Sequence, residues 1–320
     1  MKAITRQRYG TADVLTLSDL VLPEIAEDEL LVRVRAASIN RADWFMLTGT
    51  PYMLRLMSGL RRPRNPVPGR DVAGTVEAVG TGVTGFRPGD EVYAEITGGS
   101  LAEYARVPQA LAALKPGNLT FEQAATVPLA GNTALHAMRD VGRVQPGQQV
   151  LVNGASGGVG TFAVQIAKAL GAEVTGVCST RNVELVRSLG ADPIDYTAED
   201  FTAAGPRYDL ILDLVGNHSL SALRRALTPR GTLLLSSGNG GRLLGPAGRM
   251  IRALAMSALV RQRLVALTVK PGAHLDSLTA LIEAGQVTPV VERAYPLAEA
   301  AGAFRHYAES GPRSKIVITV

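Results

Sequence analysis

Residues 150–160, V-L-V-N-G-A-S-G-G-V-G, form the stretch that decides the fold. A short aliphatic run before it predicts a buried strand over 149–152, and apolar residues recur at helical spacing after it, over 161–170. The glycines leave no Cβ between the backbone and a ligand, and a helix that starts there directs N–H groups and a positive dipole end outward. The sequence therefore predicts a strand, a glycine-rich turn and a helix that suit a pyrophosphate.

The turn matches the dinucleotide fingerprint G-x-G-x-x-G at two of its three glycines. It reads Ala155-Ser156-Gly157-Gly158-Val159-Gly160, with alanine in the first glycine position. A tight turn between strand and helix in another kind of α/β domain remains an alternative when the motif is considered alone.

The residues after the second expected strand indicate which dinucleotide binds. An NAD site usually carries Asp or Glu about 20 residues past the turn, where it holds the ribose 2′-hydroxyl. This chain has no carboxylate there, and a guanidinium binds a 2′-phosphate that a carboxylate would repel. NADPH is therefore favoured over NADH. The alternative is that Arg181 lies on the first turn of a helix and binds no phosphate. The segment reads Cys178-Ser179-Thr180-Arg181-Asn182.

The composition is that of an ordinary globular chain. It has 320 residues, 46% hydrophobic and 19% charged, which is long enough for two domains. No apolar run approaches the ~20 residues of a membrane helix and no signal core opens the chain, so we expect a cytoplasmic protein without stable membrane insertion. Cys178 is the only cysteine, which excludes an intramolecular disulfide and a cysteine-built zinc site.

The chain is basic, with a net charge of +5 and a pI near 9.5. Its cations are scattered, with loose clusters only at 61–64 and 242–263, and no nucleic-acid motif accompanies them. We therefore expect no nucleic-acid partner.

The texture of the sequence changes along the chain. The first third contains Val-rich β-prone runs broken by Pro and Gly, which predict a barrel or rolled sheet, and 48–65 is expected to be a mobile loop. Strands and helices then alternate, which predicts a doubly wound parallel sheet of the α/β class. The C-terminal segment again mixes strand-like and helix-like runs. We expect a discontinuous first domain, 1–122 with 271–320, and a second domain over 123–270.

Motifs across nearly the whole chain resemble the medium-chain dehydrogenase/reductase superfamily, and most of all its zinc-independent quinone oxidoreductase branch. The resemblance implies a GroES-like β-rich catalytic domain, a Rossmann cofactor domain and an active site in the cleft between them. It also implies hydride transfer from NADPH to a quinone or to the C=C bond of an enone or enal. The motifs are A-A-S-I-N-R-A-D (36–43), P-G-R-D-V-A-G-T-V-E-A-V-G (68–80), F-R-P-G-D-E-V-Y (86–93), A-E-Y-A (102–105), A-A-T-V-P-L-A-G-N-T-A (124–134) and N-G-A-S-G-G-V-G (153–160).

The chain departs from the zinc-dependent relatives at the metal-ligand positions. Asn40 stands where those enzymes place a cysteine, and Gly69-Arg70-Asp71 replaces Gly-His-Glu. Because zinc needs sulfur or imidazole ligands in tetrahedral reach, we expect no metal. Oxidation of ordinary alcohols, which relies on a Lewis acid, is disfavoured, whereas an activated acceptor needs none.

Three residues are candidates for catalysis. Asn40 follows the strand expected at 30–37, and its counterpart in the family faces the nicotinamide and substrate; a turn Asn that satisfies local backbone is the alternative. Tyr52 is the candidate proton donor, although it could simply pack over the cleft. Asp43 is included with them, but ordering the same turn or capping the next helix is its more favoured role.

The resemblance also implies the cofactor contacts. Thr133 would lie near the nicotinamide phosphate, the 155–159 turn at the pyrophosphate, and Ser179 with Arg181 at the 2′-phosphate. Tyr196, Val215 and Gly216 would lie beside the adenosine. The turn contributes Ala155, Ser156, Gly157, Gly158 and Val159, the nicotinamide side Ser236, Gly238 and Asn239, and the C-terminal segment Ser314 and Lys315.

Segment 238–263 is open to several interpretations. An apolar helical stripe over 250–259 could wall the substrate pocket, lie on a membrane surface or face the core. The strand expected at 264–269 would be the edge of the parallel sheet, and an unpaired edge invites a second subunit, so we expect a homodimer. An NADPH-binding sensor or structural protein with little turnover is the alternative to an enzyme.

Overall fold

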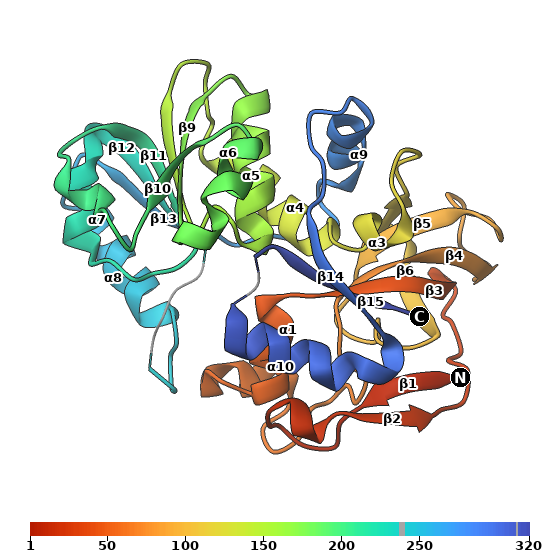
Figure 1. Ribbon diagram of the computed structural model, residues 1–320. Coiled ribbons are helices and arrows are strands. Elements are labelled where there is room, and N and C mark those ends of the chain that lie inside the picture. Colours follow the sequence, from red (N-terminus) through yellow and green to blue (C-terminus); the bar gives the residue numbers. More distant parts are fainter. Residues whose placement is uncertain (237–240, 312) are drawn as a thin grey trace. The chain divides into compact units, whose positions relative to one another are not determined.

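The computed structural model describes residues 1–236, 241–311 and 313–320 (Figure 1). Its contacts divide the chain into two compact units. The first unit holds Met1–Asn132, Lys270–Gly285 and Pro289–Val320, and the second holds Thr133–Val269 and Gln286–Thr288. The boundary falls within helix α4 (Pro128–Leu135), so residues 123–132, expected in the second domain, belong to the first unit here.

The second unit is built on a sheet of six parallel strands, in the order β10-β9-β8-β11-β12-β13. Numbered along the unit, this order is 3-2-1-4-5-6, which is that of dinucleotide-binding folds. The predicted doubly wound parallel sheet is confirmed. Its strands are β8 (Gln149–Asn153), β9 (Glu173–Cys178), β10 (Asp192–Asp195), β11 (Tyr208–Asp213), β12 (Leu227–Leu235) and β13 (Arg263–Ala266).

Helices cover this sheet because each presents an apolar side to it. Leu223 of α7 (Leu220–Ala226) and Ala253 of α8 (Ala247–Ser257) lie in one buried cluster with Ile211 and Leu233 of the sheet. The remaining helices are α5 (Gly158–Ala169) and α6 (Val183–Ser188). Helix α4 is followed directly by a π-helical turn at His136–Val141.

The first unit contains a seven-stranded sheet in the order β14-β15-β3-β4-β5-β7, with β6 also paired to β3. The last strand of the chain runs antiparallel to β3, with Ile316 opposite Ile39, which joins the C-terminal segment to this unit. A separate two-stranded sheet pairs β1 (Lys2–Thr5) with β2 (Thr16–Asp19). The other strands are β3 (Glu29–Ile39), β4 (Asp71–Val79), β5 (Glu91–Glu95), β6 (Tyr104–Pro108), β7 (Ala112–Leu114), β14 (Val291–Pro296) and β15 (Lys315–Thr319).

Short helices complete the first unit. The stretch 48–65, expected to be a mobile loop, contains a 3₁₀ turn at Tyr52–Leu54 and helix α2 (Arg55–Ser58). The others are α1 (Arg41–Thr48), α3 (Phe121–Ala124), α9 (Leu275–Glu283) and α10 (Ala300–Ser310). Within the described ranges, no helix has both the length and the apolar character needed to cross a bilayer.

Candidate active site

The glycine-rich turn joins β8 to α5 in the second unit, and its three marker positions have different roles. A Cβ at Gly160 would lie 2.1 Å from the Gly154 carbonyl oxygen, so this glycine is required for the helix to pack on the turn. A Cβ at Gly157 would come no nearer than 3.3 Å to that oxygen. Gly157 is the N-cap of α5, whose first N–H groups lack partners within the helix. The turn therefore fits an anionic group such as a pyrophosphate.

Alanine at the first marker position is accommodated by the neighbouring strand. Ala155 is fully buried, and a Cβ placed on Gly176 of β9 would lie only 2.9 Å from the Ala155 Cβ. The room that the Ala155 methyl group needs is therefore provided by the absence of a side chain at Gly176 of β9. This explains why the departure from G-x-G-x-x-G does not disturb the turn.

Asn182 links the turn to the segment that follows β9. Its amide Nδ2 donates to Ser156 Oγ at 3.0 Å and to Ser179 Oγ at 3.3 Å, and the side chain is buried. The two segments predicted to bind the pyrophosphate and the 2′-phosphate are thus joined in one unit. Arg181 is exposed beside them on the 3₁₀ turn Thr180–Asn182. Asn182 was not among the residues predicted from the sequence, although its place directly after the candidate phosphate ligands Ser179 and Arg181 was a signal.

A buried carboxylate organises the end of β11. Asp213 is 0% exposed, and its Oδ1 accepts from Asn153 Nδ2 at 2.8 Å and from the backbone N–H groups of Val215 and Gly216 at 3.2 and 3.0 Å. Its Oδ2 pairs with Arg249 of α8 at 2.5 Å, and that guanidinium also donates to the His218 carbonyl at 2.9 Å. We call Asn153, Asp213 and Arg249 the second-unit cluster. It holds the turn that carries the predicted adenosine contacts.

Of the other predicted cofactor residues of this unit, Ser236 and Tyr196 follow the carboxyl ends of strands, whereas Val159 and Thr133 lie in helices. Val159 is in the first turn of α5, and Ser236 follows β12 and donates its N–H to the Asp213 carbonyl at 3.3 Å. Tyr196 follows β10 and is 55% exposed, and Thr133 is half-buried in α4. Gly238 and Asn239 lie outside the described residues.

The first unit holds a second buried cluster, made of Asn40, Asp71 and Lys315, which we call the first-unit cluster. Asn40 Nδ2 donates to Asp71 Oδ2 at 2.9 Å, and Lys315 Nζ donates to Asn40 Oδ1 and to Asp71 Oδ2, the latter at 3.2 Å. Their exposures are 5%, 0% and 2%. The structure thus brings together Asn40 and Lys315, which the sequence analysis assigned separately to catalysis and cofactor binding.

Asp71 connects this cluster to two further elements. Its Oδ2 also accepts from Ser38 Oγ of β3 at 2.9 Å, and its Oδ1 accepts from the Leu129 N–H of α4 at 3.0 Å. From the sequence, Asp71 stood only in the segment that replaces a zinc-ligand motif, and no role was predicted for it. A carboxylate directly before the apolar residues Val72 and Ala73 was the available signal, because an acid is buried only with partners.

Asp43 lies one turn into α1 beside this cluster. Its Oδ2 accepts from the Asn40 backbone N–H at 2.8 Å, which places it in the capping role that was favoured for it. Burial raises the pKa of Asp43 to about 6, the negative charge of Asp71 adds to that rise, and the positive charge of Arg70 opposes it. Arg70 itself pairs with Glu95 at 2.7 Å.

The last two predicted site residues occupy different settings. Tyr52 is 42% exposed, and the Arg55 guanidinium carbon lies 4.8 Å from the centre of its ring. Ser314 is 2% exposed and donates its hydroxyl to the Val290 carbonyl at 2.7 Å.

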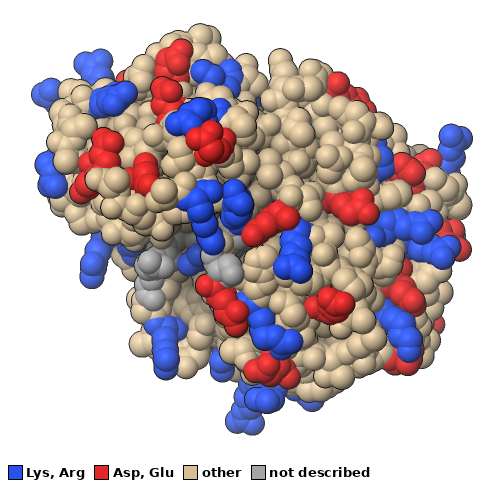
Figure 2. All heavy atoms as spheres, in the orientation of Figure 1, with Lys and Arg blue, Asp and Glu red and all other residues tan. Residues whose placement is uncertain are grey.

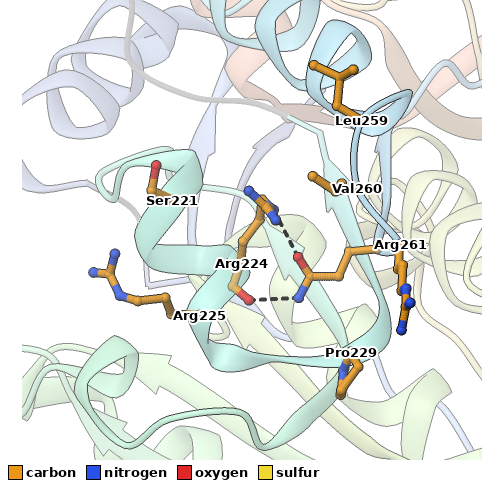
Figure 3. Close-up of a pocket in the computed structure, with 8 residues that line it drawn as sticks. Ser221, Arg224, Arg225, Pro229, Leu259, Val260 and Arg261 are labelled. Atoms are coloured by element: carbon orange, nitrogen blue, oxygen red, sulfur yellow. Dashed lines mark hydrogen bonds between the residues drawn. The ribbon is translucent and has the colours of Figure 1, made fainter.

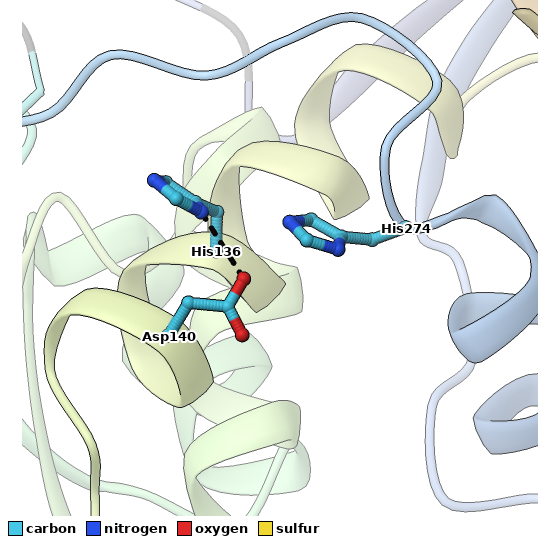
Figure 4. Close-up of side chains that lie close together, drawn as sticks. All are labelled: His136, Asp140 and His274. Carbon is cyan, nitrogen blue, oxygen red and sulfur yellow. Dashed lines mark hydrogen bonds and ion pairs between the residues drawn. The ribbon is translucent and has the colours of Figure 1, made fainter.

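The second unit contains two further features of the kind that bind metals or act as nucleophiles. His136 Nδ1 lies 3.1 Å from Asp140 Oδ2 in the π-helical turn (Figure 4), whereas His274, also drawn there, belongs to the first unit. Cys178 is buried, which raises the pKa of its thiol to about 11 and leaves it without nucleophilic character at neutral pH.

A surface pocket of about 530 Å³ lies at the amino ends of β12 and β13 (Figure 3), away from the carboxyl ends that carry the cofactor candidates. Arg224 Nε donates to Gln262 Oε1 at 2.9 Å across it, and Gln262 Nε2 donates back to the Arg224 carbonyl at 2.8 Å. It is lined by Ser221, Arg224, Arg225, Pro229, Leu259, Val260, Arg261 and Gln262. This position makes it no part of the cofactor site.

Comparison with known proteins agrees with these features. Residues 26–117 match the alcohol dehydrogenase GroES-like domain, and residues 189–318 match the zinc-binding dehydrogenase family. The chain is 35% identical over 348 residues to an NADPH-dependent alkenal/one oxidoreductase of Arabidopsis thaliana, covering 99% of this chain and 79% of the relative. A 2-methylene-furan-3-one reductase of Solanum lycopersicum is 38% identical over 264 residues, which cover 75% of this chain and 66% of that protein.

The same similarity extends to solved structures. The quinone oxidoreductase from Coxiella burnetii superposes with a TM-score of 0.87 at 28% identity, over 100% of this chain and 99% of that one. The chain belongs to the medium-chain dehydrogenase/reductase superfamily. Within it, the chain is an oxidoreductase of the quinone and enone reductase branch, whose cofactor is a nicotinamide dinucleotide.

Proposed function

We propose that this protein is an NADPH-dependent reductase that reduces a quinone or the C=C bond of an α,β-unsaturated carbonyl. One observation carries the choice of NADPH. Asn182 joins the Ser156 and Ser179 hydroxyls, so the pyrophosphate turn and a carboxylate-free segment that ends in exposed Arg181 form one surface. A guanidinium with hydroxyls binds a 2′-phosphate, whereas an NAD site uses a carboxylate.

The chain's own residues then have distinct roles in the reaction. Bound NADPH would supply the hydride. Lys315 donates to Asn40 Oδ1 and Asp71 accepts from Asn40 Nδ2, so the amide is oriented and its second nitrogen proton is directed away from Asp71. We assign that proton to the carbonyl of the acceptor or of the nicotinamide amide, where it would stabilise developing negative charge. Tyr52 is proposed as the proton donor.

The reaction is proposed to need no zinc. Asn40 and Arg70 stand at the positions of two zinc ligands in the metal-dependent relatives, and both have partners that account for them. Lys315 places a buried positive charge beside Asn40. An enone or quinone is already electron-poor, so hydrogen bonds suffice to polarise it.

A homodimer formed through the second unit is also proposed. Among the described strands, β13 has a neighbour on one side only. Helix α8 precedes it with large apolar side chains exposed, among them Ile251 at 63% and Leu254 at 71%, and Leu259 between them and the strand is 86% exposed. An apolar surface beside an open strand edge fits a second copy of this chain.

Two other expectations from the sequence stay predictions. The Arabidopsis thaliana relative is named as a chloroplast protein, so its name gives no support to the cytoplasmic location expected here. Figure 2 shows basic and acidic side chains interspersed over the face drawn, which supports the absence of a nucleic-acid partner.

The test is NADPH consumption with matched panels of quinones, enals and enones. We expect turnover with at least one class, followed by product analysis to show which bond is reduced. NADPH binding without consumption would favour the alternative, a cofactor-binding sensor or structural protein.

The cofactor preference has its own test in Arg181→Ala, measured by Kd for NADPH and NADH. Loss of one charge-assisted phosphate contact is worth about 1.5–3 kcal/mol, so NADPH binding should weaken by about 10- to 100-fold and NADH binding little. Arg187→Ala, in the same unit but on the exposed side of α6, is the matched control. Equal losses for the two cofactors would refute the 2′-phosphate role.

A further inference from the structure

We propose that residues 53–64 form a docking site for an anionic membrane surface, independently of the reductase function. Large apolar side chains are exposed there, with Leu56 at 70%, Met57 at 75% and Leu60 at 67%, and Met53 at 40%. Arg61, Arg62 and Arg64 are exposed next to them. We call these seven side chains the docking surface. Apolar patches with a polar rim mark sites of protein or membrane contact.

The segment is held in a fixed conformation beneath the docking surface. The Arg55 guanidinium stacks on Tyr9 at 4.5 Å and on Tyr52 at 4.8 Å from the ring centres, and its Nε donates to the Gly49 carbonyl at 2.9 Å. The Tyr9 hydroxyl donates to the Gly59 carbonyl at 2.6 Å and lies 2.8 Å from Ser58 Oγ. The polar groups of the segment therefore bond inward, while its apolar side chains point away from the protein's own core.

Glycine makes the return of the chain possible. Gly59 has a φ of +115°, and a Cβ there would lie 2.1 Å from the Arg62 carbonyl oxygen. The Arg64 N–H donates to the Ser58 carbonyl at 2.8 Å, which closes the loop. The arginines are thereby returned to the helix that carries Leu56 and Met57.

Charge identifies the occupant as a membrane surface. The sequence has no Asp or Glu from residue 44 to residue 70, while five arginines fall in that interval. Arg55 bonds inward and Arg70 pairs with Glu95, which leaves Arg61, Arg62 and Arg64 in the docking surface. Apolar side chains that enter the headgroup region, flanked by cations that meet anionic lipids, are the composition of interfacial membrane contacts.

The apolar face of α8 provides the contrast. It leads into the open edge of β13, whose unpaired backbone groups suit a second copy of this chain. The docking surface contains no strand and therefore offers no strand edge for pairing. A lipid surface can cover it without forming backbone hydrogen bonds. The two exposed apolar surfaces therefore have different occupants, and α8 offers a matched control.

The experiment is co-sedimentation with vesicles of phosphatidylcholine alone or phosphatidylcholine with phosphatidylserine. We expect binding only to the anionic vesicles, and weakening as salt is raised. The triple variant Arg61→Gln, Arg62→Gln and Arg64→Gln should weaken binding by about 100-fold, because each cation near the surface is worth about 1 kcal/mol. Leu56→Ser, Met57→Ser and Leu60→Ser together should also abolish co-sedimentation.

The control is the α8 variant Ile251→Ser with Leu254→Ser, which should keep vesicle binding. NADPH affinity, measured on every variant, reports whether the second unit is intact, and circular dichroism reports the fold. No binding by the unaltered protein would overturn the proposal, as would binding that survives both docking-surface variants or is lost in the α8 control. A docking-surface variant that retains vesicle binding but has a raised KM for an apolar acceptor would show a substrate cover instead.

Discussion

The two units each hold an asparagine, a buried aspartate and a cation in one cluster, and they use these groups differently. In the first-unit cluster, Lys315 reaches both Asp71 and the amide oxygen of Asn40. In the second-unit cluster, Arg249 reaches Asp213 and a backbone carbonyl, while Asp213 Oδ1 accepts two backbone N–H groups. The first arrangement orients a side chain, and the second shapes a turn of the backbone.

The difference shows what a buried carboxylate does beyond its ion pair. Lysine is a point charge with several donors, and it closes a triangle with a carboxylate and an amide. The planar guanidinium of Arg249 instead links the end of β11 to α8. We therefore expect changes in the first-unit cluster to affect the chemical step, and changes in the second to affect cofactor affinity.

The largest expected effect concerns the two aspartates. Asp71→Leu leaves Lys315 buried without its carboxylate, which costs about 3–5 kcal/mol of unfolding free energy. Asp213→Leu should cost about 1–3 kcal/mol, because the Arg249 side chain is 14% exposed and keeps the His218 carbonyl. Urea unfolding followed separately by signals from each unit measures both. A larger loss of unfolding free energy for Asp213→Leu than for Asp71→Leu would contradict this prediction.

The next effect is a pH dependence of stability that distinguishes the two clusters, because Asp43 lies beside the first-unit cluster only. Its folded pKa of about 6 lies above the unfolded value of 3.8, so the folded state binds the extra proton between these values. The stability from this group is present below about pH 4 and is lost as pH rises through about 6, in total about 3 kcal/mol.

Asp43→Asn should remove that dependence, since its amide oxygen can still accept the Asn40 N–H. Relative to Asp43→Asn, the unaltered protein should lose up to about 3 kcal/mol between about pH 4 and about pH 7 in urea unfolding. Parallel stability curves for the two proteins would show that Asp43 ionises normally and that the first-unit cluster tolerates its charge.

The smallest effect is kinetic and compares the two asparagines. Asn40→Ala should slow hydride transfer by more than about threefold with little change in NADPH Kd, because a useful donor is worth about 1 kcal/mol or more. Asn153→Ala should instead weaken NADPH binding and leave the single-turnover rate at saturating cofactor nearly unchanged. Stopped-flow measurement of hydride transfer in both variants tests this. Slower hydride transfer in Asn153→Ala alone would contradict the roles assigned to Asn40 and Asn153.

The sequence predicted the parallel sheet and the rolled sheet because both depend on local periodicity and on glycine turns. It predicted separate roles for Asn40 and Lys315, because residues 275 positions apart meet only through the pairing of β15 with β3. Asp71 and Asp213 were missed for a related reason. Asp71 begins β4 and Asp213 ends β11, and the cation that pairs with each comes from another element.

The conformation of 48–65 was also beyond the sequence analysis. A stretch rich in Pro, Gly, Met and Arg has no helical or strand period, so a loop was the natural expectation. The stacking of Arg55 between Tyr9 and Tyr52 creates order there. Such a contact depends on a residue more than 40 positions away, which no local pattern contains.

The fit between Ala155 and Gly176 has a consequence for how cofactor sites of this kind are recognised. The residue that makes room in the turn lies on the second strand, so the fingerprint is divided between two segments of the chain. A search pattern confined to the turn would score this chain as a partial match. A pattern that accepts alanine in the turn only when glycine occupies the facing strand position would score it as complete, and would reject chains in which both positions carry a Cβ.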